Sequence, residues 1–223
     1  MSEIQTQSIV VTLDDGRRYE FPPGVTALGV LEVVDPAAKK ETIGANVNGR
    51  LVDLSSLVEQ EARVKFITAT SAEGLSMLRH SAAHLMAAAV QQLLPGSQFA
   101  IGPAIQDGFY YDIEPTRPLT PDDLPVIEAK MRELSEQRLP FARLEVPLEE
   151  AIAKVTALNQ PYKVELLQTI QDRAMACTKA AEQDELAHEV DPVAEQVSFY
   201  TTGGFIDLCR GPHVLDTSVI RFF

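Results

Sequence analysis

Two hairpin signals near the start of the chain constrain the fold more than any other feature. Asp15-Gly16 separates two apolar runs in SIVVTLDDGRRYEF, and Asn48-Gly49 does the same in ANVNGRLVDL. Such dipeptides favour the tight turns of β-hairpins. The intervening TALGVLEVV has helical spacing with Thr26 as a possible cap, and ARVKFIT reads as a last strand. This order of elements predicts a small β-grasp domain, although another small α+β domain stays open.

A longer α+β region is expected after this domain. Thr70 and Glu73 have capping-box spacing, and apolar residues then recur at helical intervals as far as Pro95. The extended stretch FAIGPAIQDGFYYDIE follows. Further helices are expected from Thr120-Pro121, in LEEAIAKVTAL and from YKVELLQTI, and strands are expected in LPFARLEVP and FIDLC. Residues 170–200 are polar and acidic with few turn signals, so their secondary structure is the hardest to predict.

Four histidine and cysteine side chains form two spaced pairs. RHSAAHLM places His80 and His84 on the same face of the predicted helix. Near the end, the turn in CRGPH could bring Cys209 and His213 to one point. Together they would make a tetrahedral zinc set, although each could instead be an ordinary core or surface residue. Zinc-protease chemistry is disfavoured because Ser81 stands where that motif needs a glutamate.

Composition and charge exclude several classes of protein. The 223 residues include two cysteines, so a disulfide framework is not expected. No apolar run approaches the roughly 20 residues of a membrane helix, and no signal peptide is visible. We therefore expect a cytoplasmic protein without a membrane partner. The formal net charge of −13 argues against a free-standing nucleic-acid binder, which usually carries a basic face.

A family resemblance covers nearly the whole chain. RHSAAHLMAAAV, FAIGPAIQDGFYYDIE, PYKVELL and FIDLCRGPHV, in this order, resemble the N-terminal editing domain of bacterial-type threonyl-tRNA synthetases. The β-grasp pattern in front resembles the ubiquitin-like TGS domain of the same family. The resemblance implies an α+β fold with a TGS-like domain at 1–69 and an editing domain at 70–223. The editing domain is expected to have a central antiparallel sheet and a long helix that carries the HxxxH motif.

The resemblance also implies a function. An editing domain hydrolyses the ester of mischarged Ser-tRNA(Thr) and spares Thr-tRNA(Thr), and the threonyl site works without a metal. ATP, Mg and Zn are expected only in a class II aminoacylation core, which we expect this chain to lack. That core would attach threonine to tRNA(Thr), form the homodimer and supply most of the tRNA affinity. An acidic chain could then act on tRNA, because the core and not this chain would supply most of the binding to the RNA.

The matching residues receive expected roles. His80 would orient or activate water, and Lys163 in PYKV would bind water or the developing negative charge. His84, Cys209 and His213 would line the pocket. The common alternative for Lys163 is a solvent-exposed side chain. Cys177 and His188, in a segment that looks longer and more acidic than the family pattern, are interpreted as incidental.

Further residues are expected to bind the substrate. Asp207 would hold the serine amino group or a histidine, and Tyr111 would contact the terminal adenosine or the leaving oxygen. The backbone from Ala100 to Gly102 would exclude the methyl group of threonine, because glycine permits close approach. The ordinary alternatives are a strand-edge carboxylate for Asp207, core packing for Tyr111 and a turn glycine for Gly102.

Two other functions stay open. A related set of two histidines, a cysteine and a histidine can hold zinc in alanyl-tRNA synthetase editing domains, so a zinc-dependent aminoacyl-tRNA hydrolase is one alternative. A non-catalytic RNA- or partner-binding module, in which the set is structural, is the other.

Overall fold

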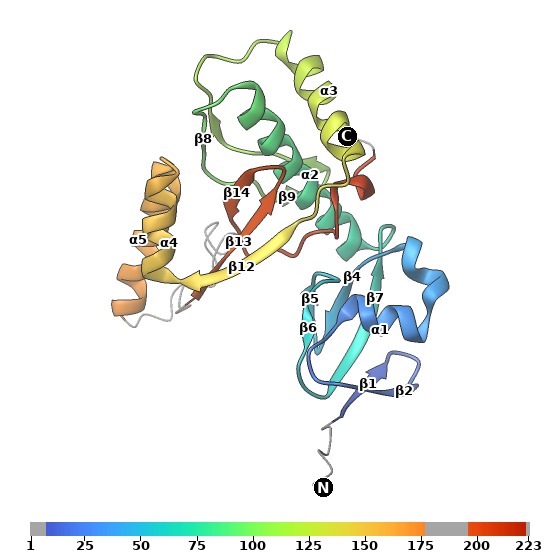
Figure 1. Cartoon of the computed structure of the whole chain (residues 1–223). Coiled ribbons are helices and arrows are strands. Elements are labelled where there is room, and N and C mark those ends of the chain that lie inside the picture. Colours follow the sequence, from blue (N-terminus) through green and yellow to red (C-terminus); the bar gives the residue numbers. More distant parts are fainter. Residues whose placement is uncertain (1–7, 177–195, 222–223) are drawn as a thin grey trace, which may run out of the picture. The chain divides into compact units, whose positions relative to one another are not determined.

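The computed structural model describes residues 8–176 and 196–221 (Figure 1), so Cys177 and His188 lie outside the described residues. Packing divides the chain into two units. The first comprises Met1–Leu78 with Pro212–Leu215, and the second comprises Arg79–Gly211 with Asp216–Phe223. The domain boundary expected between 69 and 70 stays a prediction. Within the described residues, no helix is both long and apolar enough to cross a membrane.

The first unit contains a five-stranded mixed sheet in the order β2-β1-β7-β4-β5, in which β1 and β7 run parallel. A separate two-stranded antiparallel sheet pairs β3 with β6. The predicted hairpins, helix and last strand are confirmed, and the Thr26 hydroxyl accepts a 3.0 Å hydrogen bond from the Gly29 N–H as the helix cap. The elements are β1 (Ile9–Leu13), β2 (Arg18–Phe21), β3 (Val25–Thr26), α1 (Ala27–Val34), η1 (Pro36–Lys40), β4 (Thr42–Val47), β5 (Arg50–Val52), β6 (Leu57–Val58) and β7 (Ala62–Thr68).

The core of the first unit lies on one face of this sheet. Ile9, Val11 and Leu13 of β1 are buried in a cluster that includes Val30 of α1. Side chains alternate between the two faces of a strand. The residues of β1 that alternate with these buried ones therefore project from the other face of the sheet. Thr12 is one of them, and its side chain is only partly buried.

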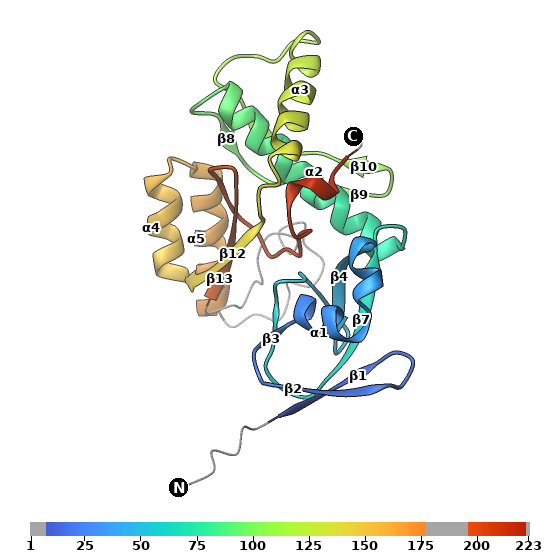
Figure 2. The same ribbon diagram turned by 45° about the vertical axis from the view of Figure 1, so that its right-hand side comes forward.

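The second unit combines helices with short antiparallel strands. Its largest sheet has the order β12-β13-β14, and α4 and α5 lie side by side against it (Figure 1 and Figure 2). Val155 of α4, Leu167 of α5 and Phe199 of β13 are buried in the shared core. The central antiparallel sheet expected for the family stays a prediction. The elements are α2 (Ala72–Leu93), which begins in the first unit, β8 (Gln98–Phe99), β9 (Ala104–Ile105), β10 (Gly108–Phe109), β11 (Ile113–Glu114), α3 (Asp123–Glu136), β12 (Ala142–Pro147), α4 (Leu148–Ala157), α5 (Pro161–Ala176), β13 (Gln196–Thr202), β14 (Phe205–Leu208) and η3 (Thr217–Val219).

Two predicted helix starts were wrong by a few residues. Helix α2 is capped by Ser71, whose Oγ accepts a 3.0 Å hydrogen bond from the Gly74 N–H, and not by Thr70. Helix α3 begins at Asp123 and not at Thr120-Pro121. The carboxylate of Asp123 accepts hydrogen bonds from the N–H and the hydroxyl of Thr120, at 2.7 and 3.0 Å. These bonds hold the residues before the helix in a turn. In both places a side chain one to three residues further along supplies the local hydrogen bonds.

Candidate functional site

His80 and His84 lie one turn apart on α2, in a part of the helix that other residues enclose. Their rings are edge to face with centroids 4.8 Å apart. His84 is 1% exposed, whereas His80 is only partly buried. Ser81 and Ala83 beside them are fully buried. The small residues therefore let neighbouring segments pack closely against the helix, and of the two histidines His80 is the more accessible.

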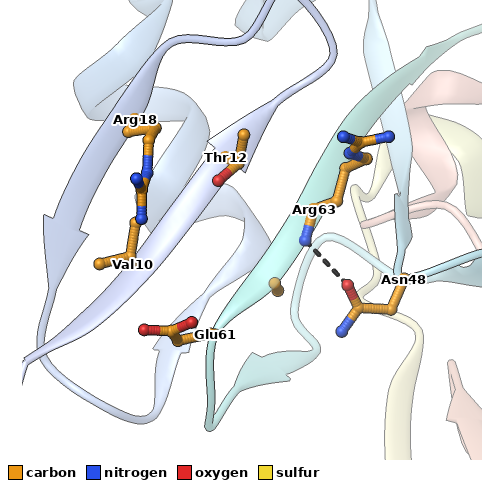
Figure 3. A pocket seen from close by; sticks show the side chains of 7 residues that line it. Val10, Thr12, Arg18, Asn48, Glu61 and Arg63 are labelled. Carbon is orange, nitrogen blue, oxygen red and sulfur yellow. Dashed lines mark hydrogen bonds between the residues drawn. The ribbon is translucent and has the colours of Figure 1, made fainter.

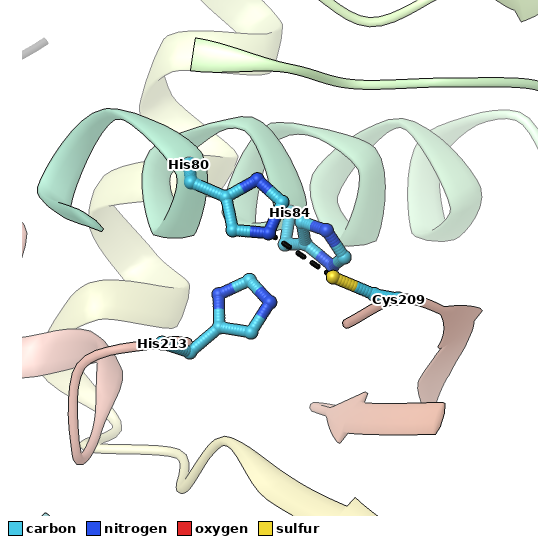
Figure 4. A group of neighbouring side chains, drawn as sticks. All are labelled: His80, His84, Cys209 and His213. Carbon is cyan, nitrogen blue, oxygen red and sulfur yellow. Dashed lines mark hydrogen bonds between the residues drawn. The ribbon is translucent and has the colours of Figure 1, made fainter. Parts of the chain in front are cut away.

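Cys209 follows β14 and meets the first histidine. Its Sγ lies 3.0 Å from Nε2 of His80 (Figure 4), and the Gly211 N–H donates to the same sulfur at 3.2 Å. Gly211 has φ +70°, and a Cβ at this position would lie 2.2 Å from the hydroxyl oxygen of Tyr200. Only glycine fits this turn without displacing its neighbours. The glycine in CRGPH therefore fixes the direction in which Cys209 faces.

His213 completes the group of possible metal ligands. Its segment, Pro212–Leu215, packs with the first unit, and its N–H donates to Oδ1 of Asp53 at 2.5 Å. Ligand atoms of His80, His84, Cys209 and His213 all lie within 4.8 Å of one another (Figure 4). Two or three imidazoles with a thiolate are a donor set that suits zinc. The four side chains could therefore hold a metal ion or line a pocket.

A buried ion pair joins α5 to β14. Lys163 and Asp207 are each 2% exposed, and Nζ of Lys163 lies 3.0 Å from Oδ1 of Asp207. The Leu208 carbonyl accepts a further hydrogen bond from Nζ at 3.4 Å. A buried ammonium is tolerated only with such partners. The alternative of a solvent-exposed lysine is thus wrong, and Lys163 is fixed inside the second unit.

Asp207 also holds two aromatic side chains. The Tyr111 hydroxyl donates to its Oδ2, and Nδ1 of His84 lies 3.5 Å from the same oxygen. Burial alone would raise the pKa of Asp207. The ammonium of Lys163 and the Tyr111 hydroxyl outweigh burial and hold the pKa below its usual value. The carboxylate is therefore ionised, and it connects Lys163, His84 and Tyr111.

Burial makes His84 a neutral imidazole. It lowers the pKa of His84 to about 3, and the positive charges of His80 and Lys163 act in the same direction. The carboxylate of Asp207 opposes the shift without cancelling it. At neutral pH the ring is uncharged, so His84 can orient other groups but does not supply a proton as an imidazolium.

The predicted substrate wall lies against Tyr111. The Ala100 N–H donates to the Asp112 carbonyl at 2.9 Å, and the Asp112 N–H donates to the Ile101 carbonyl at 2.8 Å. A Cβ on Gly102 would lie 2.3 Å from Cδ2 of Tyr111. The backbone of Gly102 thus rests on the tyrosine ring, which is 8% exposed. Contact of Ala100 or Gly102 with a substrate stays a prediction.

Gln160 is a residue that the sequence motifs did not single out. Its Oε1 accepts a 2.8 Å hydrogen bond from the Phe99 N–H, and its Nε2 donates to the Ser97 carbonyl at 3.2 Å. Its own carbonyl accepts from the Lys163 N–H at 3.1 Å. Gln160 therefore ties the first turn of α5 to β8. No sequence pattern indicated that Gln160 would contact this strand.

Two family models match parts of this chain. Residues 9–68 match the TGS domain, and residues 197–223 match the threonyl and alanyl tRNA synthetase second additional domain. The chain is similar to the threonine–tRNA ligases of Methylococcus capsulatus (46% identical), Hahella chejuensis (42%) and Teredinibacter turnerae (40%). Each match covers 96% of this chain and 30% of the relative, so the chain spans less than a third of their length. The resemblance in the sequence motifs is confirmed, because both matched domains and the similarity over 96% of the chain support a likeness to the N-terminal region of bacterial threonyl-tRNA synthetases.

Proposed function

We propose that this chain is the proofreading region of a threonyl-tRNA synthetase and hydrolyses Ser-tRNA(Thr) while sparing Thr-tRNA(Thr). The observation that carries the proposal is the buried group of Lys163, Asp207, His84 and Tyr111 in the second unit. Buried titratable side chains with shifted pKa values cluster at functional sites. The substrate is the 3′ end of tRNA(Thr) carrying serine, and the reaction uses no metal or cofactor.

The reaction is ester hydrolysis. Water adds to the seryl carbonyl carbon, the bond to the terminal ribose oxygen breaks, and serine and a ribose hydroxyl are released. This requires positioned water, a stabilised oxyanion and a proton for the leaving oxygen. His80, partly exposed beside Cys209, orients and activates the water. The ammonium of Lys163, held by Asp207, stabilises the negative charge.

The remaining site residues position the substrate. Tyr111 contacts the terminal adenosine or the leaving oxygen. Asp207 orders the site through its contacts with Lys163 and His84. The neutral ring of His84 lines the pocket together with Cys209 and His213.

Selectivity comes from a clash with a methyl group. Serine and threonine both carry a β-hydroxyl, and a pocket gains only about 1–3 kcal/mol from an added methyl-sized group. Attraction would therefore favour threonine, so the site must exclude it by repulsion. The proposed wall is the backbone from Ala100 to Gly102 with His80 and Cys209. The ring of Tyr111 supports this proposal, because the Gly102 backbone cannot move back without displacing it.

The whole protein would have a second activity. We propose that a longer parent attaches threonine to tRNA(Thr) with ATP in a class II core, which also holds Mg and Zn. The parent is a cytoplasmic homodimer formed through that core. The core supplies most of the affinity for tRNA, so the region described here accepts mainly the acceptor end.

A zinc-dependent hydrolase is the second candidate, favoured by the four ligand atoms within 4.8 Å of one another. The test is a metal analysis of the chain purified without added zinc, followed by hydrolysis assays after chelation. The metal-free mechanism predicts less than one zinc per chain and full activity after chelation. Stoichiometric zinc whose removal abolishes hydrolysis would establish the second candidate.

The direct test of hydrolysis compares two variants of α2. His80→Ala should slow single-turnover deacylation of Ser-tRNA(Thr) by about 10²–10⁴-fold, the usual contribution of an acid–base group. Ser76→Ala, an exposed position on the same helix, is the matched control and should keep the wild-type rate. No hydrolysis by the wild-type chain, or equal rates for both variants, would instead favour a non-catalytic binding module.

A further inference from the structure

The first unit carries a pocket of its own on the face of the sheet opposite its core. The pocket has a volume of about 220 Å³ and lies over β2, β1 and β7 (Figure 3). None of its lining residues belongs to the candidate site of the second unit. The residues that line it are Val10, Thr12, Arg18, Asn48, Glu61, Ala62 and Arg63.

Strand register explains why two arginines share this pocket. Strand β1 lies between β2 and β7, and its Thr12 pairs with Arg18 on β2 and with Arg63 on β7. Paired residues on neighbouring strands project from the same face. Their flanking residues, such as Val11 and Val64, point into the core. Arg18 and Arg63 therefore lie on either side of Thr12, with their backbones about 10 Å apart across two strand spacings.

Neither guanidinium is neutralised by another residue of the unit that the structure describes. Within the described part of the chain, the side chains of Arg18 and Arg63 make no ion pair or hydrogen bond, whereas Arg17 is paired with Asp15 at 2.6 Å. This is notable in a chain with 32 acidic and 19 basic residues. Two guanidinium groups that line one pocket without an ion pair among the described residues offer donors suited to a phosphate group.

Two more side chains define what else the pocket can recognise. The Oδ1 of Asn48 accepts a 2.8 Å hydrogen bond from the Arg63 N–H, which leaves its NH₂ group available as a donor (Figure 3). Glu61 lines the same pocket and can only accept hydrogen bonds when ionised. A simple anion would gain nothing from a carboxylate nearby. A ligand that carries a phosphate and a hydroxyl side by side would use both halves of the pocket.

We propose that this pocket binds one ribose–phosphate unit of an RNA strand. Arg18 and Arg63 contact the phosphate, assisted by the Thr12 hydroxyl and the Asn48 amide, and Glu61 accepts a hydrogen bond from the ribose 2′-hydroxyl. The 2′-hydroxyl is the group by which proteins distinguish RNA from DNA. The choice of RNA rests on the proposed function, in which the substrate is a tRNA. The first unit thereby gives an acidic chain a local binding site for its RNA substrate.

The test measures binding of the full chain to a labelled single-stranded RNA and to DNA of the same sequence, by fluorescence anisotropy across a salt series. The wild-type chain should prefer RNA. Arg18→Ala and Arg63→Ala should each weaken RNA binding about tenfold and lower the slope of log affinity against log salt by about one. Lys40→Ala, an exposed charge of the same unit outside the pocket, is the control and should bind as wild type.

The role of Glu61 has its own readout. Glu61→Ala should remove the preference for RNA while leaving DNA binding unchanged or tighter. Arginine variants that bind RNA like Lys40→Ala, or a wild-type chain that binds RNA and DNA equally, would overturn the proposal. Hydrolysis of Ser-tRNA(Thr) at saturating substrate should be unchanged in the arginine variants. Loss of RNA binding and loss of the proposed hydrolysis are thus separate outcomes.

Discussion

The two units use positive charge in opposite ways. In the first unit, Arg18 and Arg63 are exposed and make no ion pair within the described residues. In the second, Lys163 is 2% exposed and lies 3.0 Å from Asp207. Exposed charges attract a distant anion and are screened by salt. A buried, paired charge is held in place and acts only on what enters its site.

The difference separates binding from chemistry. Removing an exposed arginine should change affinity and its salt dependence, with little effect on folding. Removing one partner of the buried pair leaves a charge without compensation and should disturb both folding and reaction.

Asp207→Asn should have the largest effect, because it leaves the buried ammonium of Lys163 without a carboxylate. We expect a loss of about 3–5 kcal/mol in the free energy of unfolding, measured by urea denaturation. Glu133→Gln removes one partner of the exposed pair between Lys130 and Glu133 and should cost less than about 1 kcal/mol. Similar losses in the two variants would contradict the distinction between buried and exposed pairs.

Gly102→Ala should have the next largest effect. Its new Cβ would lie 2.3 Å from Cδ2 of Tyr111, and such overpacking typically costs about 1–3 kcal/mol. Because Tyr111 donates to Asp207, hydrolysis of the seryl ester should slow as well. Gly108→Ala is the control, since nothing lies within 4 Å of its added Cβ. Equal melting temperatures and rates for the two variants would show that Tyr111 is not held in place by Gly102.

The pH dependence of stability should show a graded effect from His84. Its pKa is about 3 in the folded chain and about 6.5 when unfolded, so the unfolded state binds the extra proton between these values. The contribution of His84 is therefore complete above pH 6.5 and is lost as the pH falls towards 3, by about 1.4 kcal/mol per pH unit.

His84→Asn should lack this loss, which would appear as a difference between two unfolding curves measured from pH 7 to pH 4. The lowered pKa of Asp207 places its own titration below this range. Parallel curves would mean that His84 is charged in the folded chain.

Local chemistry explains which parts could be predicted from the sequence. The hairpins at Asp15-Gly16 and Asn48-Gly49 form because the turn residues themselves select the backbone conformation. Strand β13 was not predicted, because four consecutive residues from Val197 are buried and the strand shows no alternation. Helix spacing placed His80 beside His84, since that contact is local.

The site as a whole could not be predicted from spacing. Lys163 and Asp207 come from α5 and β14, and no periodicity connects the two segments. Only the family resemblance named them together, and it did not indicate that the lysine would be buried. The hydrogen bonds of Gln160 to β8 were missed for the same reason, because they depend on packing between distant segments.

The most direct test of the account is selectivity between two esters. The chain is incubated with Ser-tRNA(Thr) and with Thr-tRNA(Thr) under equal conditions, and the first-order rates of deacylation are compared. A wall that clashes with one methyl group at a cost of about 3 kcal/mol predicts a preference for the seryl ester of roughly 100-fold, which Cys209→Ala should reduce. Equal rates of hydrolysis for the two esters would contradict the proposal that the second unit is a proofreading site.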